Sequence, residues 1–266
     1  MNERGPPVRN GAEFGWRGLV GWIHSYGMLH HTPVDLYNLL PEGLGVLFTT
    51  LNKRDQSDKE TEAALSRLTD SASLLADNGA EFFVANSTPM VTHRGPGGDR
   101  EVIRTMSQAG GGRPGTTTTT AAVQAMKAMG IRRIALCTPY KAVNQKMIAF
   151  LEGEGLEVVH EYGMTEKLTK IHRIPAEASY RIARDAVWSS PPCDALYMPG
   201  GRLPVTEIVD DLEADLGIPV IASTPTIVWE ICSFFGIKRP IEGHGSLLRE
   251  FPERAEPFLT ADRLTA

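Results

Sequence analysis

Two segments of the chain repeat the same order of residue types, and each leads into a pair of hydroxyl side chains. Residues 112–123 and residues 217–228 both place a Gly, a Pro, the hydroxyl pair and a Val at matching positions. The pairs are Thr118–Thr119 and Ser223–Thr224, and a helical pattern follows each of them. Hydroxyl groups together with the free N–H groups of a helix N-terminus favour an anion. The repeat therefore predicts a small anionic ligand between two copies of one α/β unit.

Further polar turns follow apolar runs elsewhere in the chain. His24 comes after residues 18–23, residues 86–88 read Asn-Ser-Thr, and Gly200–Gly201 follow another apolar run. The ordinary pKa of histidine suits proton transfer near neutral pH, so His24 is a candidate general acid or base. A Ser or Thr before a helix is also a common N-cap, which is a purely structural explanation for any single pair. Several such turns at one sheet edge favour a binding site.

These turns must be positioned by strands and helices that alternate along the chain. Apolar runs predict strands at residues 18–23, 45–50, 81–85, 133–138, 157–161, 194–198 and 217–222, and helical spacing predicts helices at 58–77, 143–153 and 176–189. This alternation predicts an α/β fold with parallel sheets and right-handed crossovers. Ligands bind such sheets beyond the carboxyl ends of the strands, where the polar turns lie.

The internal duplication predicts how the chain is divided. We expect two pseudo-symmetric Rossmann-like lobes, each with a parallel sheet flanked by helices, and an active site in the cleft between them. Residues 1–116 together with residues 225–266 form the first lobe in this prediction, and residues 117–224 form the second.

Composition narrows the possible functions. The 266 residues are 42% apolar and carry a net charge of −5, which argues against a broad basic surface for nucleic acid. No apolar run is long enough to span a membrane, and the first residues lack the apolar core of a signal peptide, so we expect a cytoplasmic protein. The three cysteines lie far apart, which indicates neither a disulfide framework nor a zinc site.

Several motifs of the chain point to one family when they are taken together. They are residues 117–140, Val143–Asn144, Gly200–Gly201, Leu212–Glu213, residues 216–223, Trp229 and residues 243–248. The combination resembles the Asp/Glu racemase superfamily, in particular its branch of arylmalonate decarboxylases and maleate cis–trans isomerases. The likeness covers roughly residues 18–250 of the sequence.

The resemblance implies cofactor-free chemistry on small carboxylates in a cleft between two lobes. Members of the family usually hold one or two cysteines in this cleft, one from each lobe, as acids, bases or nucleophiles. In this sequence the two positions fall on Ser87 and Pro199, and Cys137, Cys193 and Cys232 lie elsewhere. We therefore expect a cofactor-independent isomerase or lyase that works without a catalytic cysteine, through an enediolate-type or covalent intermediate.

The predicted catalytic residues are Ser87, Tyr140 and His24, and Tyr140 matches a tyrosine of the family. The predicted substrate-binding residues are Asn86, Thr88, Thr118, Thr119, Asn144, Gly200, Gly201, Ser223, Thr224 and His244. Neither a cofactor nor a metal is expected, because no HExxH or paired-carboxylate spacing accompanies the histidines. The expected partner is a small carboxylate substrate, with no nucleic acid and no membrane, in a homo-oligomer that is a dimer or larger.

Two alternatives stay open at this point. In the first, Ser87 or an activated water attacks a carbonyl, which makes the protein a hydrolase or a ring-opening lyase. In the second, the protein binds a carboxylate in the cleft and catalyses no reaction.

Overall fold

The computed structural model describes residues 13–139, 141–165, 167 and 170–264. It contains two parallel sheets of four strands each, with the orders β2–β1–β3–β4 and β6–β5–β7–β8. The strands are β1 Gly18–Tyr26, β2 Leu44–Lys53, β3 Phe82–Asn86, β4 Gly115–Thr117, β5 Arg133–Thr138, β6 Glu157–Gly163, β7 Ala195–Met198 and β8 Val220–Ala222. Each strand of the first sheet has an equivalent in the second, four strands later in the chain. The predicted pair of pseudo-symmetric α/β lobes is confirmed.

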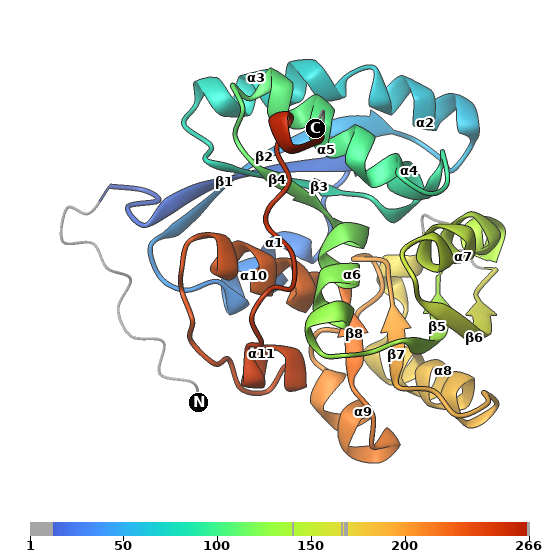
Figure 1. The fold of residues 1–266 in the computed structure, drawn as a ribbon. Helices are drawn as coiled ribbons and strands as arrows, with labels where there is room; N and C mark the ends of the chain where they lie inside the picture. Colours follow the sequence, from blue (N-terminus) through green and yellow to red (C-terminus); the bar gives the residue numbers. More distant parts are fainter. Residues whose placement is uncertain (1–12, 140, 166, 168–169, 265–266) are drawn as a thin grey trace.

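Helices cover both faces of each sheet (Figure 1). They are α1 Thr32–Leu39, α2 Asp58–Leu65, α3 Leu68–Asp77, α4 Thr88–Thr92, α5 Gly98–Ala109, α6 Thr118–Ala128, α7 Asn144–Gly153, α8 Ala176–Trp188, α9 Val209–Leu216, α10 Ser223–Phe234 and α11 Ser246–Glu250. Short 3₁₀ turns lie at Lys141–Val143, Ile171–Arg173 and Asp262–Leu264. The repeated segments noted in the sequence form β4 with α6 and β8 with α10, so the hydroxyl pairs begin the two helices.

Alternating side chains divide the core of the first lobe into two layers. Trp22 and Phe82 point to one face, where they pack with α1 and α10. Ile23 and Phe83 point to the other face and pack with α3 and α5. Successive residues of a strand face opposite sides, so a strand buried on both faces is apolar throughout.

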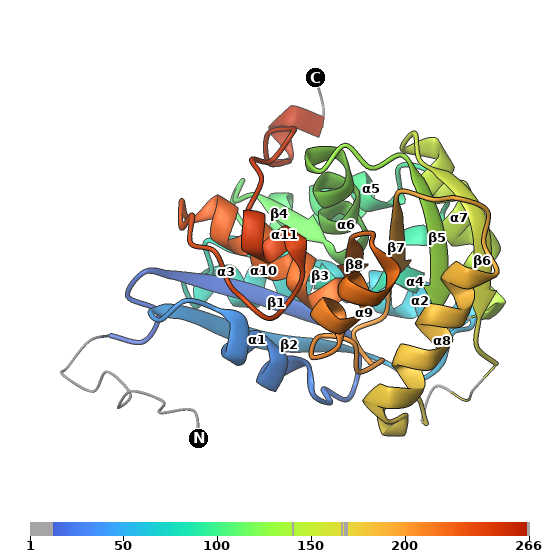
Figure 2. The same ribbon diagram turned by 90° about the horizontal axis from the view of Figure 1, so that it is seen from below.

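The second sheet is covered in the same way. Helix α7 packs on the face that carries Ile134 and Leu136, and α8 and α9 pack on the face of Ala135 and Leu196. Figure 2 shows α7 and α8 on opposite sides of this sheet. Helix α6 joins the lobes, because its buried side chains contribute to a core layer of each of them.

Several of the predicted elements have different boundaries in the structure. Strand β2 extends to Lys53, β6 extends to Gly163, and β8 begins only at Val220. The helix predicted over residues 58–77 is two helices, α2 and α3, which are separated at residues 66–67. Nη1 of Arg67 donates to the carbonyl oxygen of Leu51 at 2.7 Å. The first strand does not end at residue 23 but continues to Tyr26, pairing with β2 on one side and β3 on the other. His24 and Tyr26 are therefore held by the sheet and not by a loop.

Within the described residues, no helix is long and apolar enough to cross a membrane. The division of the lobes at residues 116 and 224, the location in the cytoplasm and the homo-oligomeric state stay predictions.

Candidate active site

A small cavity lies where the carboxyl ends of the central strands of both lobes meet. Its volume is about 20 Å³, measured as the space open to the centre of a water molecule, and its lining residues come from both lobes. They are His24, Tyr26, Asn86, Ser87, Thr88, Pro89, Thr118, Gly200, Gly201 and Arg202. None of the described lining residues is acidic, which suits an anionic ligand.

Strand ends and helix starts bring these residues together. His24 lies directly opposite Asn86, because β1 and β3 are neighbours in parallel register. Ser87 and Thr88 follow at the start of α4. Thr118 begins α6 directly after β4, the strand that pairs with β3 on its other side. The second lobe contributes the loop after β7. That loop turns at Gly200, whose φ of 113° is a conformation that glycine adopts without strain.

A chain of hydrogen bonds fixes the orientation of the His24 ring. Nδ1 of His24 lies 2.9 Å from Oδ1 of Asn86, and Nδ2 of Asn86 donates to Oγ1 of Thr118 at 3.4 Å. The amide oxygen of Asn86 only accepts, so Nδ1 of His24 carries the proton. Nε2 is consequently the nitrogen with a free lone pair, and it is buried with no hydrogen-bond partner among the described residues.

The surroundings keep the His24 ring neutral. Burial and, as the next cause, the positive charge of Arg202 lower its pKa from 6.5 to about 4, while the hydrogen bond with Asn86 acts in the opposite direction. Desolvation and a nearby cation both disfavour the imidazolium. At neutral pH the ring is therefore positioned to accept a proton at Nε2.

Hydroxyl groups and a helix N-terminus surround the rest of the cavity. Oγ of Ser87 accepts from the N–H of Met90 at 3.2 Å as the N-cap of α4, which leaves the Ser87 proton available to a ligand. Oγ1 of Thr88 is buried and has no hydrogen-bond partner among the described residues. Thr118 starts the eleven-residue helix α6, whose first N–H groups have no partner within the helix. Together these groups can hold a carboxylate.

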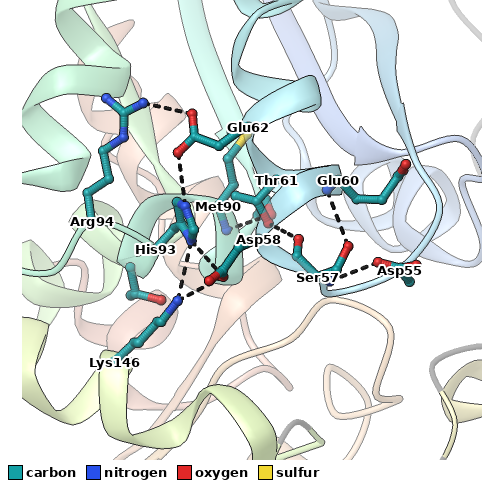
Figure 3. A network of polar contacts seen from close by, with 12 residues as sticks. Asp55, Ser57, Asp58, Glu60, Thr61, Glu62, Met90, His93, Arg94 and Lys146 are labelled. Carbon is teal, nitrogen blue, oxygen red and sulfur yellow. Dashed lines mark hydrogen bonds and ion pairs between the residues drawn. The ribbon is translucent and has the colours of Figure 1, made fainter.

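The far end of α4 is fixed by charged residues of two other helices (Figure 3). His93, which ends α4, lies 3.1 Å from Asp58 and 3.0 Å from Glu62, both on α2. Lys146 of α7, in the second lobe, contacts Asp58 at 2.9 Å. The helix that presents Ser87 and Thr88 is thus tied to both lobes.

Tyr26 and Arg202 line the cavity but were missed in the sequence analysis. The guanidinium carbon of Arg202 lies 4.3 Å from the centre of the Tyr26 ring, and Nζ of Lys53 lies 5.6 Å from the same centre. Cations favour the face of an aromatic ring, and the Tyr26 ring lies close to two positive charges. Arg202 directly follows Gly200–Gly201 in the sequence, and this position is the feature from which it could have been predicted to line the site.

Several predicted site residues do not line this cavity. Oγ of Ser223 accepts from the N–H of Gly200 at 2.9 Å, so it supports the loop from outside the lining of the cavity. Oδ1 of Asn144 accepts from Thr138 at 2.6 Å, and Nδ1 of His244 lies 3.0 Å from the carbonyl oxygen of Thr206. Two further residues, Thr119 and Thr224, are buried at helix starts outside the lining. Tyr140 lies outside the described residues.

The described residues contain no group of three or more His, Cys, Asp or Glu side chains that can hold a metal ion. The ligands offered by the cavity are hydroxyls, an amide, one imidazole and a guanidinium. This set matches an anion better than a metal cation.

Comparison with known proteins agrees with this geometry. A family model described as arylmalonate decarboxylase matches residues 30–248. The chain belongs to this family. Its relatives include the arylmalonate decarboxylase of Bordetella bronchiseptica, 27% identical over 224 residues that span 82% of this chain and 91% of that protein. The maleate isomerase of Nocardia farcinica (strain IFM 10152) is 25% identical over 229 residues, 83% of each protein.

A crystal structure of a mutant arylmalonate decarboxylase in the liganded form shares the fold of this family member. Its TM-score is 0.80 at 24% identity, with coverage of 88% of this chain and 99% of that one. The family and both relatives are decarboxylase and isomerase enzymes. This arylmalonate decarboxylase family member is accordingly an enzyme of the isomerase or lyase type.

The cysteines of this family member lie away from the cavity. Cys137 and Cys232 are buried in the cores, and burial raises the pKa of each thiol to about 12. Cys193 is half-buried and packs beside the core of the second lobe. No cysteine is found among the described residues that line the cavity.

Proposed function

We propose that the protein is a cofactor-independent isomerase or lyase that forms an enediolate from a small carboxylate, with His24 as the base. The observation that carries this proposal is the neutral, buried His24 ring, whose Nε2 has a free lone pair beside an anion-binding cavity. A general base must be unprotonated at the working pH and able to reach its proton, and the cavity supplies the first condition.

The carboxylate of the substrate binds the hydroxyl groups of Ser87 and Thr88 and the N-terminus of α6. Arg202, from the second lobe, balances the negative charge of the carboxylate. Its guanidinium lies against the ring of Tyr26 of the first lobe. These groups stabilise an enediolate more than the carboxylate itself, because the negative charge on the two oxygen atoms grows as the intermediate forms.

The reaction begins with breakage of the bond between hydrogen and the carbon next to the carboxylate. The proton moves to Nε2 of His24, and the electron pair of the broken bond moves into the carboxylate to give the enediolate. Return of the proton to another position or face gives isomerisation, and loss of a leaving group from the neighbouring carbon gives a lyase reaction. The bound anion offsets the charge of Arg202, which raises the pKa of His24 and strengthens it as a base.

Simple decarboxylation is less well supported. An enediolate formed by loss of CO₂ needs a proton donor, and Nε2 of the neutral His24 carries no proton. Burial also raises the pKa of Tyr26 to about 12, which makes it a weak acid. Proton removal from the substrate is therefore the chemistry that the cavity favours.

The experiment is proton–deuterium exchange at the carbon next to the carboxylate, in D₂O, over a panel of dicarboxylates, arylmalonates and arylacetates. We expect exchange with at least one acid, and a decrease of about 10²–10⁴-fold in His24→Gln. His160→Gln, a histidine of β6 outside the cavity, is the control and keeps the wild-type rate. Absence of exchange and turnover over the whole panel contradicts the proposal, as does unchanged exchange in His24→Gln.

The hydrolase alternative predicts a covalent adduct on Ser87. Within the described residues no hydrogen bond joins Ser87 to His24, so the structure supplies no activated serine. Mass spectrometry of the protein quenched during turnover distinguishes the hydrolase alternative from the proposed mechanism. Only the alternative predicts an increase in the mass of the peptide that contains Ser87.

A further inference from the structure

A second, larger cavity adjoins the first one and shares two residues with it. Its volume is about 760 Å³, measured as the space open to the centre of a water molecule, and Tyr26 and Arg202 line both cavities. The other lining residues are Gly27, Met28, His30, Asn52, Lys53, Arg54, His172 and Arg173. The volume exceeds what a single carboxylate needs and lies within the range of roughly 300–1000 Å³ that is usual for ligand-binding sites.

The described lining of this cavity carries four cationic side chains and no acidic one. Lys53 is the most unusual of them. It ends β2, its side chain is only 2% exposed, and Nζ has no hydrogen-bond partner among the described residues. Burial of this charge costs free energy that its contact with the Tyr26 ring offsets only in part, so a ligand that hydrogen-bonds to Nζ regains some of that free energy on binding. Asp55, Asp58 and Glu60 lie close enough to act on the charge of Lys53 but do not line the cavity.

Two stacked imidazole rings form a flat wall of the same cavity. The ring centres of His30 and His172 are 4.1 Å apart, and the planes differ by only 4°. Burial lowers the pKa of His30 to about 4, with Arg202 as the next cause, and burial followed by Arg173 lowers that of His172. The rings are therefore neutral at pH 7, and two neutral rings stack without charge repulsion. A planar spacer can stack on this wall.

We propose that the larger cavity binds a second anionic group, a carboxylate or a phosphate, at the far end of an elongated substrate. The first carboxylate of that substrate lies in the small cavity, its spacer passes Tyr26, and its second anion meets Lys53 after a rotation of the flexible lysine stem. The inference rests on the proposed function, because it assigns the reacting carboxylate to the small cavity. The proposal predicts a substrate that is longer than a compact diacid, whose two carboxylates would share one cavity.

The test compares ligands that differ only at the far end. Isothermal titration calorimetry measures the binding of 4-carboxyphenylacetate, 4-(phosphonooxy)phenylacetate and 4-nitrophenylacetate. The first two are called dianions because each carries a second anionic group beside its acetate, and the phosphate group itself holds up to two charges. The nitro compound has a neutral far end of nearly the same shape as the carboxylate. The wild type is expected to bind at least one dianion about tenfold or more tightly than the nitro compound. The two dianions separate a carboxylate from a phosphate as the preferred second group.

Variants of Lys53 test whether this residue causes the preference for the dianions over the nitro compound. Lys53→Gln is expected to bind the dianion and the nitro compound within about twofold of each other, while Lys53→Arg, which keeps the charge, retains most of the preference. Lys59→Gln is the control, because Lys59 is an exposed lysine of α2 outside the lining. The inference is overturned by a wild type that shows no preference or does not bind the dianions. It is equally overturned by a preference that survives in Lys53→Gln, or by its loss in both Lys53 variants.

A second readout separates this inference from the proposed function. Deuterium exchange at the benzylic carbon is followed for all three ligands in wild type and His24→Gln. His24-dependent exchange without a preference for the dianions leaves the proposed function intact and rejects the second anion site. A preference that depends on Lys53, without any exchange, supports the second site and counts against His24 as the base.

Discussion

Nδ1 of His24 lies 2.9 Å from Oδ1 of Asn86, and this contact leaves Nε2 as the ring nitrogen without a hydrogen-bond partner among the described residues. The two residues are paired across neighbouring parallel strands, so the backbone register itself holds them together. Asn86 also donates to Thr118, which leaves its amide oxygen turned toward the imidazole. An acid–base histidine needs such a second residue, because a free ring divides between two tautomers.

Replacement of Asn86 tests this relationship. Asn86→Leu removes the acceptor for Nδ1–H, and we expect the proton-exchange rate to fall by about 10–100-fold, as when residues that orient a histidine are lost. Nitrogen NMR of the imidazole reports the tautomer directly and is expected to show a mixture in the variant. Asn78→Leu, at the exposed end of α3, serves as the comparison. Wild-type exchange in Asn86→Leu contradicts the assigned role.

The pKa of His24 predicts how activity depends on pH. Since it lies at about 4 in the free protein, exchange is expected to stay constant from neutral pH down to about pH 5 and to fall below that. Arg202→Gln removes a positive charge that disfavours the imidazolium, so the pKa of His24 rises. The acidic limb of the pH–rate profile, where exchange falls off, then moves to higher pH. Titration of the His24 ring signals by NMR checks the same shift. A limb that stays in place or moves to lower pH counts against Arg202 as a cause.

The same lowered pKa makes stability depend on pH. Between about pH 4 and 6.5 the unfolded chain binds a proton at His24 and the folded protein does not. The free energy of unfolding therefore rises with pH across this window. Its slope against pH is smaller in His24→Gln. Urea unfolding at a series of pH values measures the slope, and equal slopes for the two proteins contradict the prediction.

Ser87 combines an N-cap with one of the proposed contacts to the ligand. Ser87→Ala is expected to lower stability by about 1 kcal/mol through loss of the cap and to weaken substrate binding by about tenfold through loss of one hydrogen bond. Ser57→Ala is the matched control, because Ser57 caps α2 in the same way and lies away from the cavity. It should lose similar stability and no affinity. A loss of kcat beyond a thousandfold in Ser87→Ala favours the nucleophile alternative instead.

Activity is expected to resist iodoacetamide. Alkylation needs an accessible thiolate, and burial raises the pKa of Cys137 and Cys232 to about 12. Only Cys193, which is half-buried, is expected to gain the carbamidomethyl group in peptide mass spectrometry. Rapid inactivation that substrate prevents means that a cysteine reaches the reacting atoms, contrary to the proposal.

The sequence alone predicted the parallel α/β lobes and much of the small cavity. Continuous apolar runs indicate strands buried on both faces, and the ends of such strands meet at one edge of a sheet. For this reason His24, Asn86, Thr88, Thr118 and the glycine pair were found from local pattern alone. The matching segments at Thr118 and Ser223 also predicted correctly that the two lobes repeat one unit.

Only the tertiary structure decided which polar side chains face the ligand. Ser223 matches Thr118 in the repeat, yet its hydroxyl accepts from the N–H of Gly200, whereas Thr118 lines the cavity. Tyr26, Lys53 and Arg202 are far apart in the chain, and no local pattern marks them as a group. They meet because the carboxyl ends of β1 and β2 face the β7 loop of the other lobe. Hydrophobic patterning specifies each element separately, while the contacts between the lobes depend on how the finished elements pack.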